Sequence, residues 1–350
     1  MGLEQTMTEI LMRILSPFKE PFTQGSNVYW LYLFSGFGLA TLLYRFKLTN
    51  QDNHKNLLEY LFPKEIYLHS SFITQCKQYF ATCWYTVFIL IPLIGVVQKN
   101  AQDITSQALT QITGITTVFE IKNPQLVHYL ALTIFTVLIA DFGFFVGHYI
   151  AHKIPFLWEF HKAHHSAEVL TPFTTSYLYN PFDLFVIQII NFTVISIGSG
   201  IWIYIFGNQM QELLIFGDNI IIFILFLVNN LQHSHFWVAY PYWIGHILCS
   251  PAQHQIHHSV DPKHWDKNFG SLFSLWDWMI GSLYVPRGYE KLDFGLPDGE
   301  SKLFNGVTNI FLQPFRAVWQ RSRQTSDRSE LGGESHSDPE EGSTERQAIF

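Results

Sequence analysis

The sequence predicts an all-α, multi-pass membrane protein, a bundle of about five spans with a histidine-rich helical cap. Of the 350 residues, 48% are hydrophobic, 17% are aromatic and only 14% are charged, whereas soluble domains carry about 25% charged residues. Five stretches are apolar over close to the ~20 residues that a membrane-spanning helix requires. Histidines cluster after the third and fifth of these stretches, and they predict the cap.

The five apolar stretches cover residues 27–44, 79–97, 127–147, 183–206 and 212–229. Only the short polar turn 207–211 separates the last two, so we expect a helical hairpin through the membrane. One such stretch could be a buried helix of a soluble protein, but five in a chain of this composition favour a membrane. Residues 10–18 are shorter and contain Arg13 and Pro17; they are typical of an interfacial amphipathic helix rather than a signal peptide.

Basic residues are unevenly distributed among the loops. The loop 45–78 carries five, the loop 98–126 carries two, and the turn 207–211 carries none. Since positive charge marks the cytoplasmic side, we expect the N-terminus outside, and the C-terminus and the segments after the third and fifth spans on the cytoplasmic side.

Several classes of protein and site are disfavoured. The net charge of −7 is mild and no basic block occurs, so nucleic-acid binding has no support. Cys76, Cys83 and Cys249 form no CxxC motif, which argues against a disulfide framework or a cysteine-based metal site. Residues 321–350 are rich in Ser, Glu, Gly and Arg and predict a disordered tail, in which His336 is a solvated polar residue.

Four short segments carry the clustered histidines. They read HYIAH at 148–152, HKAHH at 161–165, QH at 232–233 and HQIHH at 254–258. Spacings of three and four residues place side chains on one helical face. An even number of crossings, two, separates the first two segments from the last two, so all four emerge on the same side of the membrane. The candidate metal ligands are His148, His152, His161, His164, His165, His233, His254, His257 and His258.

Nine imidazoles fit a site for two metals. Neutral imidazole is a good ligand for iron, zinc and copper. Two metals with four to six positions each need roughly 8–10 protein ligands, whereas one metal cannot use nine. No ExxH pair of the kind found in soluble di-iron bundles occurs, so an all-histidine site is favoured.

Three further residues near these segments have open roles. His233 is preferred to His235 as a ligand because it lies four residues after Asn229, which we expect as a water-mediated neighbour. Asp141 lies seven residues before His148 inside the third span, where a carboxylate is costly. It either accepts an N–H from a metal-bound histidine or joins a helix–helix contact. Ordinary hydrogen-bonding roles are expected for His54, His69, His128, His246 and His264.

The motifs resemble the fatty acid hydroxylase/sterol desaturase superfamily of integral-membrane di-iron enzymes. The similarity extends over residues 126–297, including WEFHKAHHSAEVLTPFTT and KNFGSLFSLWDWMIGSLYVP. It implies that the nine histidines hold two iron ions, with O₂ as co-substrate. Family members hydroxylate, desaturate or demethylate sterols or hydroxylate acyl chains, and one branch cleaves ether lipids. Some acyl-chain hydroxylases have a further histidine where this chain has Trp237, so one coordination position is left to water.

The resemblance also implies a domain organisation. We expect an N-terminal membrane region with two spans (1–125), a fatty acid hydroxylase-like catalytic domain (126–297), a C-terminal amphipathic segment (298–320) and the tail (321–350). The expected function is a membrane-bound oxygenase that hydroxylates or desaturates a sterol or acyl-chain lipid at the cytoplasmic face. No glycine-rich nucleotide or flavin motif occurs, so the electrons come from a separate donor of the cytochrome b5, ferredoxin or reductase type.

Three alternatives remain. An ether-lipid (alkylglycerol-type) monooxygenase would keep the site and change the substrate. A metal transporter would place its ligands in broken helices near mid-membrane, whereas these histidines follow the ends of spans. A non-catalytic metal-binding protein would consume no O₂. A group of aromatic residues either lines a lipid path or, as we prefer, forms an interfacial belt: Trp158, Phe160, Phe236, Trp237 and Trp243.

Overall fold

The computed structural model describes residues 3–46, 56–208 and 210–331. Over this part the regular elements are helices, apart from one short antiparallel hairpin. The helices and strands are α1 (Leu3–Ile14), α2 (Ser16–Lys19), η1 (Glu20–Phe22), α3 (Trp30–Arg45), α4 (Leu57–Leu61), α5 (Lys64–Tyr67), α6 (Ser70–Tyr85), η2 (Thr86–Leu90), α7 (Ile91–Thr113), α8 (Leu126–Lys153), α9 (Pro155–His165), α10 (Pro172–Tyr177), α11 (Pro181–Phe206), β1 (Leu214–Ile215), β2 (Asp218–Asn219), α12 (Ile220–Asn229), η3 (Ile244–His246), α13 (Pro251–His257), η4 (Pro262–His264), α14 (Leu275–Ile280), η5 (Pro297–Phe304) and α15 (Val307–Leu331).

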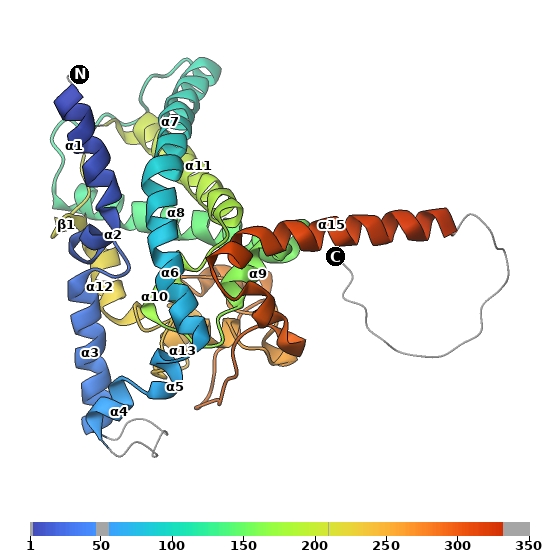
Figure 1. The fold of residues 1–350 in the computed structure, drawn as a ribbon. Helices are drawn as coiled ribbons and strands as arrows, with labels where there is room; N and C mark the ends of the chain where they lie inside the picture. The colour runs from blue at the N-terminus through green and yellow to red at the C-terminus, as the bar shows by residue number, and fades with distance from the viewer. Residues whose placement is uncertain (1–2, 47–55, 209, 332–350) are drawn as a thin grey trace.

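Three long helices form the membrane part of the described chain. Helix α6, the π-helical turn η2 and α7 run on as one column from Ser70 to Thr113 (Figure 1). This column, α8 and α11 are long and apolar enough to cross a membrane, and the chain is an integral membrane protein. Pro92 lies next to the π turn and has no N–H to continue the α-helical hydrogen bonds, which accounts for the irregularity.

Helix α11 packs along both of its long neighbours, α7 and α8. Glycine permits the close approach. A Cβ atom at Gly143 of α8 would lie 2.9 Å from the backbone oxygen of Asn191, and one at Gly200 of α11 would lie 2.7 Å from that of Gln102. Small residues at such crossings let helix backbones approach in a membrane, so these two positions fix how the three helices assemble.

The prediction that residues 212–229 form a spanning helix is wrong. Helix α12 has only ten residues, about 15 Å of helix, which is half of a ~30 Å hydrocarbon core. The residues before it form the β1–β2 hairpin, whose turn at Phe216 and Gly217 has positive φ angles. The hairpin attaches to α8, because Thr133 accepts from Asn219 and its hydroxyl oxygen accepts from the backbone N–H of Leu213.

The predicted first span also differs from the structure. Helix α3 has 16 residues and packs beside the short α12 (Figure 1). Tyr32 of α3 packs against Phe223 and Phe226 of α12. Of the five predicted spans, three correspond to helices in the described chain that meet the length and hydropathy requirement, so the expected count is not confirmed.

The ends of the described chain are helical. Met7, Ile10 and Leu11 of α1 are exposed, as expected for a helix that lies at a membrane interface. At the other end, α15 extends away from the other helices (Figure 1). It continues to Leu331, so the tail expected from residue 321 is wrong for residues 321–331; residues 332–350, including His336, lie outside the described residues.

Candidate metal centre

The end of α8 and the following helix α9 carry five of the histidines. His148 and His152 lie one turn apart near the end of α8. Ile154 is extended (φ −94°, ψ 113°) because Pro155 follows it, so the chain turns there and α9 begins at the proline. Helix α9 carries the buried His161, His164 and His165. The corner at Pro155 brings their imidazoles close to those of α8.

The remaining histidines lie after α12 and on α13. A capping box between Ser250 and Gln253 starts α13, which carries His254 and His257 and ends at His258. His233 lies in the turn after α12. The buried amide of Gln255 donates to the backbone oxygens of Leu231, Ser234 and Phe236. One side chain of α13 therefore holds the turn that carries His233.

The structure brings all nine predicted histidines together, in two groups. The ligand atoms within each group lie within 4.8 Å of one another. The five-histidine group contains His148, His152, His161, His165 and His257. The four-histidine group contains His164, His233, His254 and His258. All except the half-buried His152 are buried, as expected for a centre closed to bulk water.

The hydrogen bonds of His148 and His257 show why these groups fit metal ions. Each Nδ1 lies 2.8 Å from a backbone oxygen, that of Phe269 for His148 and that of Lys267 for His257. A carbonyl oxygen only accepts, so each Nδ1 carries the proton and each neutral ring has a lone pair on Nε2. These two Nε2 atoms face each other at 3.1 Å with no proton to share. A cation between them removes this repulsion.

Other buried ring nitrogens are also available to a cation. The Nε2 of His161 is buried without a hydrogen-bond partner, although buried polar atoms are normally paired. In the four-histidine group, Nε2 of His233 lies 3.0 Å from that of His258 and 3.1 Å from that of His254. Burial, with repulsion from neighbouring imidazoles added to it, lowers the pKa of these three rings well below its usual value. They are therefore neutral and available as ligands.

Two residues that the sequence analysis missed contact the ring system. Asp183, in the first turn of α11, lies 2.9 Å from Nδ1 of His161 and orients this imidazole with Nε2 toward the group. Tyr179 stacks on His164, with ring centroids 4.3 Å apart, and its hydroxyl lies 3.4 Å from Nε2 of that ring. Neither residue belongs to a histidine motif, and sequence spacing gave no signal for either.

The contacts of Asp141 exclude one of its two expected roles, that of accepting an N–H from a histidine. Its carboxylate accepts from the backbone N–H groups of Leu272 and Phe273 and from the indole of Trp276, and from no histidine of the described chain. It therefore fixes the segment after α13 against α8. Since Phe269 of that segment accepts from His148, Asp141 acts on the centre through the backbone.

The structure separates His233 from His235. His235 donates from Nε2 to the backbone oxygen of Tyr60 at 2.8 Å, and only His233 lies in a histidine group. Asn229 accepts from the Tyr240 hydroxyl. The other histidines have ordinary hydrogen-bond partners: those of His69, His128, His246 and His264 are Ser71, Gln125, Tyr242 and Glu290. His54 lies outside the described residues.

A cavity of about 210 Å³ opens beside the centre. His148, His164, His233 and His254 form part of its wall, and Tyr179 and Asn229 also line it. The wall includes none of the five aromatic residues weighed for a lipid path. Trp243 is 70% exposed, as in an interfacial belt, whereas Phe160 and Phe236 are buried in the core and do not belong to one.

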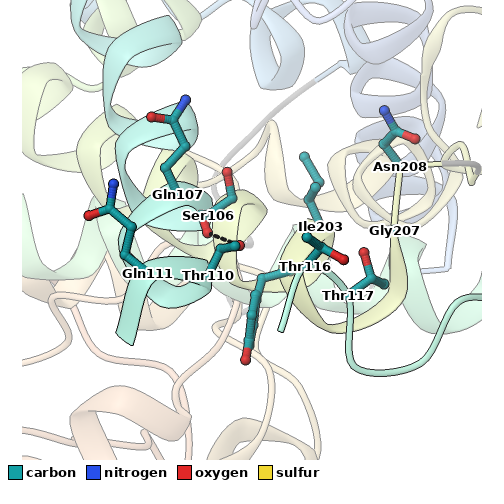
Figure 2. A pocket seen from close by; sticks show the side chains of 10 residues that line it. Ser106, Gln107, Thr110, Gln111, Thr116, Thr117, Ile203, Gly207 and Asn208 are labelled. Atoms are coloured by element: carbon teal, nitrogen blue, oxygen red, sulfur yellow. Dashed lines mark hydrogen bonds between the residues drawn. The ribbon is translucent and has the colours of Figure 1, made fainter. Parts of the chain in front are cut away.

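A second cavity, of about 410 Å³, lies near the other end of α11 (Figure 2). Serine, threonine, glutamine and asparagine side chains from α7, from the segment after it and from the residues just after α11 form much of its wall. It contains no histidine, cysteine or carboxylate. It therefore offers no typical metal ligand, and the chemistry belongs to the histidine end.

Fold and site define the class: an integral-membrane helical protein with a buried histidine centre that could hold metal ions. Residues 133–282 match the model of the fatty acid hydroxylase family. No solved structure matches the chain significantly.

Curated relatives match about half of the chain. Alkylglycerol monooxygenase of Caenorhabditis elegans is 26% identical over 53% of this chain and 32% of its own length. Ornithine lipid hydroxylase OlsE of Rhizobium tropici is 26% identical over 51% of this chain and 48% of its own. Human cholesterol 25-hydroxylase is 27% identical over 46% and 54%. The chain thus spans between a third and about half of the length of these relatives.

Proposed function

We propose that the protein is a membrane-bound oxygenase that uses two iron ions, O₂ and electrons from a separate donor to hydroxylate or desaturate a lipid. The observation that carries the proposal is the pair of unprotonated nitrogens of His148 and His257, which face each other in one of two imidazole groups beside a cavity. The names of the relatives, which are lipid hydroxylases and monooxygenases, support the same chemistry.

Each histidine group would hold one iron. Iron is favoured over zinc because oxidation of a C–H bond with O₂ requires a redox-active metal, and the bound iron would supply that chemistry. The protein supplies the geometry: Asp183 and the backbone oxygens of Phe269 and Lys267 hold Nδ1 protons, so that Nε2 is directed inward. His164, His233 and His254 line the cavity, so a substrate there lies against the four-histidine group.

The centre is proposed to face the cytoplasm. The segments that carry the histidines also carry basic residues at the end of α8, on α9 and after α12. Positive charge is typical of the cytoplasmic side of a membrane. The electron donor, of the cytochrome b5, ferredoxin or reductase type, would dock there. The basic residues concerned are Lys153, Lys162, Lys263, Lys267 and Arg287.

Cleavage of ether lipids is the second candidate. Relatives from Caenorhabditis elegans and human carry the name alkylglycerol monooxygenase, and such an activity in this chain would use the same histidine centre on a different lipid. A metal transporter is disfavoured, because the histidines lie at the end of α8 and beyond it, on α9 and α13, rather than at breaks within the long helices.

The test combines metal content with lipid analysis. Protein solubilised gently from iron-replete membranes is expected to contain close to two irons per chain. Lipids from cells that express it, compared by mass spectrometry with lipids from cells without it, should gain one oxygen atom for hydroxylation or lose two hydrogens for desaturation. Protein that holds no iron and takes up none on reconstitution would contradict the proposal.

A further inference from the structure

Residues 268–282 form a lobe that leaves the histidine end of the molecule and returns to it. At the neck of this lobe, the backbone N–H of Asn268 donates to the backbone oxygen of Ser282. Just before the neck, Asp266 lies 2.7 Å from the amino group of Lys153, the last residue of α8. Charged side chains at the end of a membrane helix remain at the interface with water, so the neck lies at the water boundary.

From its neck the lobe follows α8 back toward the middle of that helix. The ring of Phe269 packs against Tyr149, with centroids 5.3 Å apart, and the ring of Trp276 packs against Phe142 at 5.0 Å. The part of α8 between Phe142 and Lys153 is about 16 Å long. A membrane span needs about 20 residues, and every stretch of that length within α8 contains Phe142. Trp276, which contacts it, therefore lies at membrane depth.

The hydrogen bonds of the lobe backbone are a second, independent sign of membrane depth. The carboxylate of Asp141, on α8, accepts from two backbone N–H groups of the lobe. Asp277, a buried residue of the lobe itself, accepts from the backbone N–H groups of Phe269 and Gly270. Irregular backbone at membrane depth is tolerated only where the protein satisfies its polar groups. Two buried carboxylates meet that requirement here, whereas a loop in water could leave these groups to solvent.

The tip of the lobe exposes large apolar side chains. Trp278, Met279 and Ile280 of α14 are 61%, 67% and 48% exposed. Beside them, Ile247 is 54% exposed, and its backbone oxygen accepts from the N–H of Ser274, the residue before α14. These four apolar residues, here called the lobe face, carry no charge. Exposed apolar side chains gathered in this way mark an interaction surface.

We propose that residues 268–282 are a re-entrant lobe, and that the lobe face contacts the acyl chains of the membrane leaflet on the histidine side. The lobe face continues the lipid-facing surface of α8, because the partly exposed Phe142 of α8 packs against Trp276. Just before η3, the guanidinium of Arg287 lies 5.0 Å from the ring centroid of Tyr242. A basic and an aromatic side chain together are typical of the headgroup level, which places the rim of the lobe there.

The lobe links the bilayer to the candidate metal centre. The backbone oxygen of Phe269, within the lobe, lies 2.8 Å from Nδ1 of His148. The backbone oxygen of Lys267, just before the neck, lies 2.8 Å from Nδ1 of His257. The segment that orients these two imidazoles is therefore held by α8 on one side and by lipid on the other. This placement does not depend on which reaction the centre catalyses.

The experiment locates a fluorescent label relative to lipid and water. Met279→Cys is made in the full chain together with Cys76→Ser, since the other two cysteines are buried. The thiol at position 279 receives an uncharged fluorophore, and the protein is placed in phosphatidylcholine nanodiscs. A doxyl group on the acyl chains quenches labels in the bilayer, and iodide quenches labels in water. Lys291→Cys is the matched control, because Lys291 is exposed and lies after the lobe, beyond its neck.

The two quenchers should act on opposite positions. We expect the label at position 279 to lose most of its fluorescence to the doxyl lipid and none to iodide, and the label at position 291 to show the reverse. Ile280→Cys repeats the measurement on the same face if the first variant does not fold. Quenching at the lobe face by iodide, alone or together with the doxyl lipid, would place the lobe in water and overturn the proposal. Quenching by neither would also overturn it, because another protein chain would then cover the face.

Discussion

His148 and His257 are 109 residues apart in the sequence, yet their Nε2 atoms lie 3.1 Å from each other. Each ring is fixed from behind by a backbone oxygen, that of Phe269 or of Lys267. Both oxygens belong to the segment that follows α13, which Asp141 ties to α8. The fold therefore holds two lone pairs together against their repulsion, an arrangement that a bound cation would stabilise.

Replacement of His257 by alanine should abolish lipid oxidation. The change removes one nitrogen of the five-histidine group, and since loss of even an outer hydrogen-bond partner costs 10–100-fold in metal affinity or activity, we expect a loss of on the order of 100-fold or more. Product formation and iron content in purified protein measure it. His246→Ala is the control, because His246 bonds only locally to Tyr242; retained activity in His257→Ala would remove His257 from the ligands.

Asp183→Ala should weaken iron binding without removing a ligand. The carboxylate holds Nδ1 of His161 at 2.9 Å, so its loss frees the ring to turn, and we expect a 10–100-fold drop in affinity. Iron retained against increasing chelator measures the effect. Asp183→Asn keeps an oxygen acceptor and should lie between wild type and the alanine variant. A chelator profile for Asp183→Ala that matches wild type would show that this contact does not support the centre.

The sequence predicted the long helices better than the short ones. Residues 127–147 and 183–206 form spans because a long apolar run has few alternatives to a helix in a membrane. The same reasoning failed at 212–229, where Phe216 and Gly217 form a turn and hydrophobicity does not distinguish a half-length helix from a spanning one. The prediction that all four histidine segments lie on one side still holds, because α12 leads from the β1–β2 hairpin back to His233.

The candidate site shows a similar division between local and distant information. Helical spacing predicted which histidines share a face, and the structure places all nine in two groups. The partner of His161 could not be predicted, because Asp183 lies 22 residues away on another helix. Both a histidine contact and a helix–helix contact were open for Asp141, because its donors lie 131 to 135 residues further along the chain and sequence spacing says nothing about such pairs.

Asp141→Asn should destabilise the folded protein. The carboxylate accepts three hydrogen bonds, two of them from the backbone of Leu272 and Phe273, whereas an asparagine presents one oxygen and a nitrogen that cannot accept. An unsatisfied buried donor costs about 1–3 kcal/mol, so we expect a lower midpoint of thermal unfolding in detergent and a partial loss of iron. Asp103→Asn, at an exposed position, should change neither; equal midpoints for the two variants would contradict this role.

Activity and stability should differ between chains truncated after Trp319 and after Arg323. Arg321 of α15 lies 2.7 Å from Glu159, whose side chain is only 2% exposed, and Lys162 is the other cation near that carboxylate. A chain that ends after Arg323 keeps both cations and should be as active as the full chain. A chain that ends after Trp319 leaves the buried Glu159 with one cation, Lys162 of α9, the helix that also carries His161, and removal of one partner from a buried charge is destabilising. We therefore expect its thermal midpoint and activity to fall. Arg321→Ala should reproduce the loss and the exposed Arg316→Ala should not, whereas full activity after truncation at Trp319 would show that α9 is held without Arg321.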